Sequence, residues 1–187
     1  LKDAKRRVFN FYEKNKDASV VHDNLKDMKD VLSYDLQYQK GAWVLHMLRN
    51  YVGEDNFRAG IRNYYKKYFN STTNTEEFKI EMEKVSGVNL DKFFDQWLYK
   101  GGIIKLDVEW KYDEKSKNIE FDITQVQNDG YLFEMPLDIE ILGDNNSNTS
   151  TIRLDKKSGK YLVYSENKPK EIKLDPYTKL LANWTIN

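Results

Sequence analysis

The 187-residue sequence contains no cysteine and only two histidines. Without cysteine, the chain can form no disulfide framework, no thiolate zinc site and no cysteine nucleophile. Lys+Arg and Asp+Glu both number 30, so the basic excess that is typical of nucleic-acid binding proteins is missing. No run of about 18 apolar residues occurs, so no membrane-spanning segment is expected within these residues. The composition therefore predicts neither a nucleic-acid partner nor a membrane span.

The first residues, Leu1-Lys2-Asp3-Ala4, include neither an initiating methionine nor the apolar core of a signal peptide. We therefore expect this sequence to be the middle of a longer gene product. Its length suits one large domain or two small ones. The lysine- and asparagine-rich composition is typical of a bacterial source, and it leaves the cellular compartment open.

In the first hundred residues, the apolar side chains recur every three or four positions, which is the period of an amphipathic helix. Within the expected helix at residues 38–52, residues 41–48 are apolar nearly all round, as is typical of a helix buried on several sides. Thr73 and Glu76 have the spacing of a capping box, so the next-to-last helix begins at Thr73 or Thr75. Helices are expected around residues 8–12, 38–52, 54–68, 73–86 and 90–98, with a polar loop at residues 15–30.

Beyond Gly101 the period of the apolar residues changes to two, which is the period of a half-buried strand. Strands are expected at residues 104–112, 119–123, 135–141, 151–154, 160–164 and 171–174, with turns at residues 128–130, 143–148, 158–159 and 168–169. Short strands with turns at this spacing predict an antiparallel β-sandwich. The predicted fold class is α+β in two domains, an all-α helical bundle at residues 1–101 and a β-sandwich at residues 102–187.

The segment Tyr38-Gln39-Lys40-Gly41-Ala42 resembles the Tyr-x-Lys-Gly-Ala block of the aminopeptidase N family of zinc metallopeptidases, the gluzincins. Further segments resemble that family in order and spacing: residues 53–57, 60–64, 75–78, 86–90, 93–98, 136–139, 174–176 and 180–181. The resemblance implies that residues 1–101 are the helical C-terminal part of a thermolysin-like catalytic domain. Residues 102–187 would then be the β-sandwich domain that follows it.

The zinc site of this family is an HExxH-x18-E arrangement, in which two imidazoles and a carboxylate hold the metal and the HExxH glutamate is the general base. This sequence has no HExxH, and neither His22 nor His46 has a second histidine at helical spacing. The resemblance therefore implies that zinc is bound by the full-length enzyme through upstream residues. No metal or cofactor ligand is expected in these 187 residues, and the isolated fragment is expected to be inactive.

By resemblance, the full-length protein is an aminopeptidase that removes N-terminal residues from peptides. Its partners would be the peptide substrate and, for this fragment, the upstream part of its own catalytic domain. Tyr38 occupies the position whose phenol stabilises the oxyanion of the tetrahedral intermediate, a role that suits a neutral, preorganised donor. Read from its position alone, Tyr38 is also compatible with an ordinary tyrosine at a helix start, and Tyr34 competes for the alignment. Lys40 and Gly41 are expected to be structural, with the glycine permitting a close helix approach.

An alternative function is a non-catalytic helical-plus-sandwich module that binds protein or carbohydrate. Most of the 13 Tyr, 9 Phe and 4 Trp fall on regular helical or strand stripes and are expected to form cores. Tyr131 and Phe133 are the expected exposed exceptions. His46 is expected to be a core or boundary histidine and His22 a solvated one. An apolar patch on residues 38–52, uncovered in the fragment, would favour its self-association.

Overall fold

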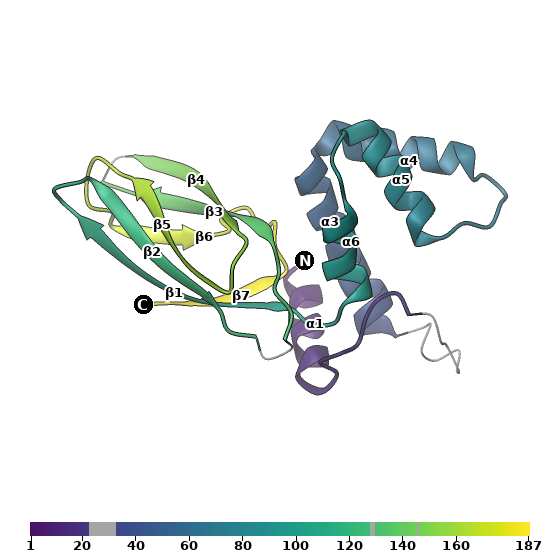
Figure 1. The fold of residues 1–187 in the computed structure, drawn as a ribbon, viewed down its shortest axis with the longest axis horizontal. Coiled ribbons are helices and arrows are strands. Elements are labelled where there is room, and N and C mark those ends of the chain that lie inside the picture. Colours follow the sequence, from purple (N-terminus) through teal and green to yellow (C-terminus); the bar gives the residue numbers. More distant parts are fainter. Residues whose placement is uncertain (23–32, 128–129, 145) are drawn as a thin grey trace. The chain divides into compact units, whose positions relative to one another are not determined.

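The computed structural model describes residues 1–22, 33–127, 130–144 and 146–187, and the chain separates into two compact units, Leu1–Gly101 and Gly102–Asn187 (Figure 1). The first unit is helical and the second contains two β-sheets, so the predicted α+β fold class is confirmed. The predicted loop at residues 15–30 and the turns at residues 128–130 and 143–148 lie partly outside the described residues.

The helical unit follows the predicted order of helices. Its elements are α1 (Lys2–Lys14), the π-helix η1 (Tyr34–Lys40), α3 (Gly41–Val52), α4 (Glu54–Lys67), α5 (Thr75–Ser86), α6 (Asp91–Phe94) and the π-helix η2 (Asp95–Tyr99). The predicted helices at residues 38–52 and 90–98 each include a π-helical segment, which the three-to-four periodicity cannot distinguish from an α-helix. No helix in the described ranges has the length and hydrophobicity that crossing a bilayer requires.

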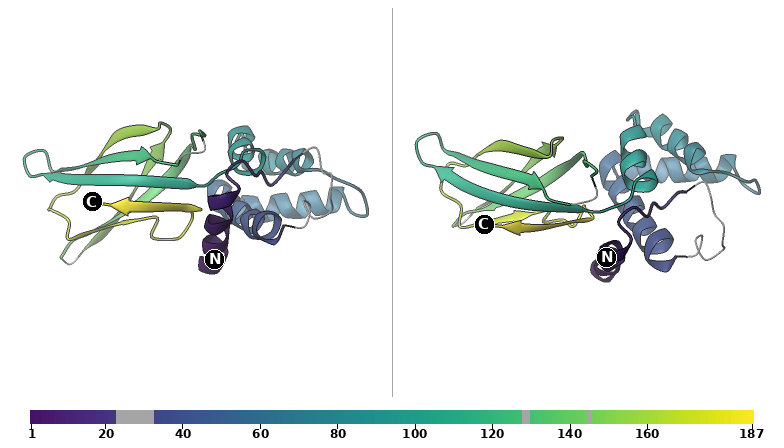
Figure 2. Two further views of the ribbon diagram at one scale, coloured as in Figure 1. Left: turned by 90° about the horizontal axis from the view of Figure 1, so that it is seen from below. Right: turned by 60° about the horizontal axis from the view of Figure 1, so that its bottom comes forward.

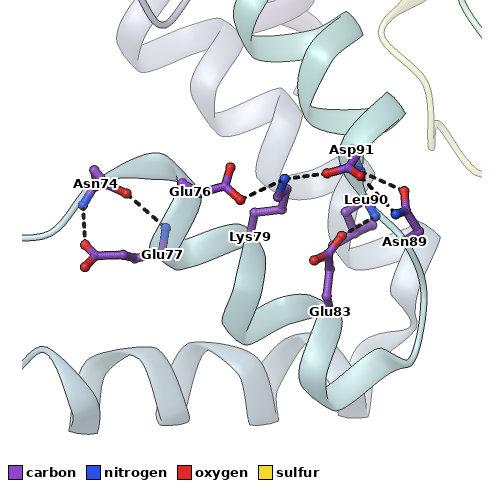
Figure 3. A network of polar contacts seen from close by, with 8 residues as sticks. All are labelled: Asn74, Glu76, Glu77, Lys79, Glu83, Asn89, Leu90 and Asp91. Carbon is purple, nitrogen blue, oxygen red and sulfur yellow. Dashed lines mark hydrogen bonds and ion pairs between the residues drawn. The ribbon is translucent and has the colours of Figure 1, made fainter.

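Helix α5 begins at Thr75, one of the two predicted starts, but its cap differs from the prediction. The N-cap is Asn74, whose side-chain oxygen accepts the Glu77 backbone N–H at 3.0 Å, while the Glu77 carboxylate accepts the Asn74 N–H at 2.9 Å (Figure 3). The predicted capping box of Thr73 and Glu76 is therefore wrong. Asparagine is a stronger N-cap than threonine, and the Thr73 hydroxyl instead donates to the Glu77 carboxylate at 2.8 Å.

A polar network joins α5 to the start of α6 (Figure 3). The Lys79 ammonium lies 2.9 Å from the Glu76 carboxylate and also pairs with Asp91. Further along α5, the Glu83 carboxylate accepts the backbone N–H of Leu90 at 2.7 Å. These contacts satisfy the N-terminal end of the short α6 and fix where the chain turns after α5.

The core of the helical unit is formed largely by α3 and by the α6–η2 segment. Gly60 is the one buried residue of α4, and a Cβ at Gly60 would lie 2.5 Å from the Met82 sulfur, so this glycine allows α4 and α5 to approach closely. The buried apolar residues of the unit are Val8, Tyr12, Leu36, Trp43, Val44, Met47, Leu48, Val52, Met82, Leu90, Phe93, Phe94, Trp97 and Leu98. Five of these belong to α3, as the apolar pattern of residues 38–52 predicted.

The second unit consists of two sheets that lie in separate layers (Figure 2). Its strands are β1 (Ile104–Asp113), β2 (Asn118–Gln125), β3 (Met135–Leu142), β4 (Ser147–Leu154), β5 (Ser158–Tyr164), β6 (Glu171–Leu174) and β7 (Ala182–Ile186). The sheet orders are β5-β2-β1-β7 and β4-β3-β6. Buried and outward residues alternate along β2, as the period of two predicted.

Strand β7 is the one element of the sandwich that the sequence did not predict. It pairs in parallel with β1, Ile104 opposite Ala182, whereas the other pairs between described strands are antiparallel. The alternation in β7 is short, and it directly follows the buried Leu180 and Leu181, which hide its period. The predicted sandwich therefore has one mixed sheet.

The side chain of Gln125 binds the backbone of Phe133. Its side-chain N–H donates to the Phe133 carbonyl at 2.7 Å and its side-chain oxygen accepts the Phe133 N–H at 3.1 Å. Phe133 is fully buried and Tyr131 is half-buried, so the prediction that both are exposed is wrong. The exposed residue between them is Leu132.

Asp138 on β3 holds the loop between β6 and β7. Its nearly buried carboxylate accepts hydrogen bonds from the Thr151 hydroxyl at 2.6 Å and the Lys179 ammonium at 2.7 Å, and its carbonyl accepts the Asp175 N–H at 2.8 Å. The Asp175 carboxylate in turn accepts the backbone N–H groups of Lys179 and Leu180 at 2.7 and 2.9 Å. These hydrogen bonds fix the loop against β3 immediately before β7 begins.

Burial and hydrogen bonding act in opposite directions on the pKa of Asp138. Desolvation raises the pKa of Asp138. The hydrogen bonds from Lys179 and Thr151 together lower it by more than burial raises it, so the pKa of Asp138 lies below its ordinary value. A depressed folded-state pKa stabilises the fold above the unfolded-state pKa of about 4, and this contribution is lost as the pH falls below it. We expect the free energy of unfolding of the sandwich to fall with pH below about 5.

Urea unfolding of the unsubstituted chain, Asp138→Asn and Glu114→Gln between pH 6 and pH 2 would check this expectation. Asp138→Asn should flatten the pH dependence, because an amide cannot titrate. Glu114 is exposed in the same unit, so Glu114→Gln should leave the dependence unchanged. An unchanged dependence in Asp138→Asn would contradict the assignment.

Candidate active-site tyrosine

Tyr38 lies inside η1 and presents its phenol at the surface of the helical unit. Its side chain is 57% exposed, and its ring stacks on Tyr34 with centroids 6.0 Å apart and ring planes at 25°. Among the described residues, neither hydroxyl has a hydrogen-bond partner. The phenol of Tyr38 can therefore donate to a group outside this chain.

The π-helical turn determines which side chains of η1 point outward. The backbone N–H of Gly41 donates to the Leu36 carbonyl, five residues earlier, which is the bond of a π-helix. Leu36 and Lys40 are the buried residues of η1, while Tyr34 and Tyr38 are more than half exposed. Single π-helical turns occur frequently at functional sites. The local structure at Tyr38 is thus of a kind that enzymes use to present a side chain.

Arg7 of α1 distinguishes the two stacked tyrosines. Its guanidinium carbon lies 5.4 Å from the ring centroid of Tyr34, and its Nη1 lies 3.6 Å from Asp35 Oδ1. Tyr34 therefore contacts both α1 and Tyr38, as a packing residue would. Of the two stacked tyrosines, Tyr34 is the one that Arg7 contacts.

Three buried side-chain atoms in the described ranges have no hydrogen-bond partner, and all three lie close to Tyr38 in the sequence. They are Asp35 Oδ1, Gln37 Oε1 and Trp43 Nε1. Buried polar groups in native proteins nearly always have a partner, so each exception requires a water molecule or further protein atoms. Within the described ranges, the buried side-chain atoms that lack a hydrogen bond therefore gather in residues 35–43, and Asp35 Oδ1 has only the ion pair with Arg7.

The histidines do not form a metal site. His46 is half-buried on α3, edge-on to Trp43 with ring centroids 5.4 Å apart, and its Nε2 lies 3.4 Å from the Asn50 amide nitrogen. Nowhere in residues 1–22, 33–127, 130–144 and 146–187 does a group of three His, Cys, Asp or Glu side chains lie close enough to hold a metal ion. The residues described here therefore offer no ligand set that fits zinc.

The two residues after Gln39 behave differently from each other. A Cβ at Gly41 would meet no atom within 4 Å, so the predicted close helix approach does not occur against the described residues. Lys40 is fully buried, and its ammonium donates to the Tyr12 hydroxyl at 2.6 Å. Sequence reasoning treated Lys40 as structural but missed this contact, because nothing in the pattern links two residues that are 28 positions apart.

Comparisons with known proteins show similarity to a peptidase family and to aminopeptidases. Residues 4–97 match the Peptidase family M1 domain. The chain is 32% identical over 111 residues to a leucyl aminopeptidase of Saccharolobus solfataricus, covering 58% of this chain and 14% of that protein. It is 28% identical over 144 residues to probable aminopeptidase 1 of Sulfurisphaera tokodaii, covering 75% of this chain and 18% of that protein.

The fold is similar to that of Legionella pneumophila aminopeptidase A, whose crystal structure is a complex with aspartic acid. The TM-score is 0.77 and the identity 15%, over 98% of this chain and 23% of the other. At this identity, the likeness concerns the fold. The chain spans less than a fifth of the length of the two curated relatives named above.

Proposed function

Because the chain belongs to peptidase family M1, as its motifs predicted, we propose that the whole protein is a zinc-dependent aminopeptidase that removes N-terminal residues from peptides. Residues 1–101 are the end of its catalytic domain and residues 102–187 the β-sandwich domain that follows. The zinc ligands lie outside this chain, and the 187-residue part alone is inactive. The observation that carries the proposal is a Tyr-x-Lys-Gly-Ala segment that spans the end of the π-helix η1 and the start of α3, with the Tyr38 phenol exposed.

Tyr38 donates a hydrogen bond to the oxyanion of the tetrahedral intermediate. Attack on a peptide carbonyl places negative charge on its oxygen, and a preorganised donor about 2.7–3.1 Å away stabilises that charge. The stacking contact with Tyr34 limits the motion of the Tyr38 ring, and the hydroxyl has no competing partner in the described ranges. These features support the role of Tyr38 as an oxyanion donor.

The upstream part of the catalytic domain docks on residues 35–43. The buried Gln37 Oε1 needs a donor and Trp43 Nε1 needs an acceptor, whereas Asp35 Oδ1 already forms an ion pair with Arg7 at 3.6 Å. An adjoining protein segment supplies both missing partners and brings the substrate carbonyl towards Tyr38. Leu45 on the neighbouring α3 is 43% exposed, which supports self-association of the fragment when that segment is absent.

Hydrolysis of leucine p-nitroanilide by the full-length protein tests the proposed function. We expect cleavage that disappears with 1,10-phenanthroline and returns with added zinc, and no cleavage of the N-acetylated substrate, which lacks a free N-terminus. The 187-residue chain should cleave neither substrate. Zinc-dependent cleavage by the 187-residue chain would contradict its inactivity. A full-length protein that lacks HExxH-x18-E and cleaves nothing would favour the non-catalytic binding module.

A further inference from the structure

Lys40 is a fully buried lysine two residues after Tyr38. Its ammonium donates to the Tyr12 hydroxyl at 2.6 Å and lies 4.6 Å from the centroid of the Tyr12 ring. The Tyr12 hydroxyl in turn donates to the Ala18 carbonyl at 2.6 Å. Lysine is almost never fully buried unless its charge is paired or hydrogen-bonded, because desolvating an ammonium is costly. The position of Lys40 therefore requires a reason beyond filling space.

The contact ties together three parts of the helical unit. Lys40 is the last residue of η1, Tyr12 is a buried residue of α1, and Ala18 lies in the segment after α1. The outward residues of η1, Tyr34 and Tyr38, make no hydrogen bond through their hydroxyls to the described residues. The position of the Tyr38 backbone thus depends on what holds the buried side of η1.

The π-helix is much rarer than the α-helix, so a π-helical turn needs tertiary contacts that favour it over the α-helical alternative. The hydrogen bond between Lys40 and Tyr12 is such a contact. Conversion of the π-turn to an α-turn would remove one residue from the turn. Since one α-helical residue corresponds to about 100° of rotation, Tyr38 would turn by about that angle relative to α3. A displacement of even about 1 Å at a catalytic group can cost about 10²-fold in rate.

We propose that Lys40 is a positioning residue for Tyr38: its ammonium, held by the Tyr12 hydroxyl, keeps η1 in the π-helical form that presents the Tyr38 phenol. This inference rests on the proposed role of Tyr38. A methionine at position 40 would fill a similar volume without the directional hydrogen bond. Phenylalanine at position 12 would keep the ring and remove only the hydroxyl that accepts the hydrogen bond from Lys40.

The test uses the full-length enzyme with leucine p-nitroanilide. Lys40→Met and Tyr12→Phe should each lower kcat about 10-fold with little change in KM, because the displaced group acts in the transition state. The matched control is Lys66→Met, which replaces an exposed lysine of α4 and should leave kcat and KM unchanged. Wild-type kcat in both Lys40→Met and Tyr12→Phe would overturn the inference.

A double variant separates positioning from general structural damage. Because Lys40 acts through the Tyr38 hydroxyl, Lys40→Met should lower kcat no further in a Tyr38→Phe background. A second drop in kcat in the double variant would overturn the inference. If Lys40→Met does not fold, the same comparison is made with Tyr12→Phe. Wild-type kcat in Tyr38→Phe itself would remove the proposed role of Tyr38, whereas a normal kcat in only the Lys40 and Tyr12 variants would remove the positioning role.

Discussion

Replacing Tyr38 by phenylalanine in the full-length protein is expected to lower kcat about 10²- to 10³-fold, as loss of an oxyanion donor does in other enzymes. The substitution removes the phenolic oxygen and keeps the ring that stacks on Tyr34. Because the lost hydrogen bond forms only with the transition state, kcat and kcat/KM should fall together and KM should change little. Steady-state hydrolysis of leucine p-nitroanilide measures both constants.

Tyr34→Phe is the matched control for this prediction. Tyr34 and Tyr38 lie in the same π-helix and are 56% and 57% exposed, so the two substitutions disturb the fold to a similar degree. We expect near-normal kcat in Tyr34→Phe, because its ring contacts with Arg7 and Tyr38 do not need the hydroxyl. The reverse pattern, with kcat lost in Tyr34→Phe alone, would assign the oxyanion donor to Tyr34.

Replacing Phe121 by alanine is expected to destabilise the β-sandwich by about 3–5 kcal/mol, the usual cost of removing a buried aromatic side chain from a core. Phe121 is fully buried in β2, opposite Trp110 of β1 and Tyr161 of β5. The loss combines the transfer free energy of the ring with the cavity that remains. Amide hydrogen exchange in β1 and β2 reports the free energy of opening of this unit by itself.

Leu162→Ala is the control on the outer face of the same sheet. Leu162 lies in β5 opposite Glu120 and is 66% exposed, so its truncation should cost less than about 0.5 kcal/mol. Equal protection losses in Phe121→Ala and Leu162→Ala would mean that the alternation of buried and outward residues along β2 and β5 is misassigned.

The candidate site was predictable only in part. The spacing of Tyr38, Lys40 and Gly41 is a sequence property and led to the family, which the domain match confirms. The catalytic role of Tyr38 stays a prediction. Three features of the site could not be predicted: the π-helical turn, the stacking of Tyr38 on Tyr34, and the burial of Lys40 against Tyr12. The first two depend on backbone geometry that a period of three to four does not specify. The third depends on a contact between η1 and α1.

Local patterns and the lack of certain residues were sufficient for the broader features. The change of period near Gly101 determined a helical part followed by a β part, because the side chains of helices and strands repeat differently. The positions of the only two histidines, His22 and His46, determined that this chain has no HExxH motif, because that motif needs two histidines four residues apart. Both are properties of neighbouring residues or of composition, and neither depends on how distant segments meet.

Only the tertiary structure decided the features that join distant residues. Phe133 is buried because Gln125 bonds its backbone, and β7 joins β1 in parallel after a loop that Asp138 holds. Lys40 is buried where Tyr12, on another helix, accepts a hydrogen bond from its ammonium group. A one-dimensional pattern records which residues are apolar and at what spacing, whereas a hydrogen bond between segments depends on where folding brings them together.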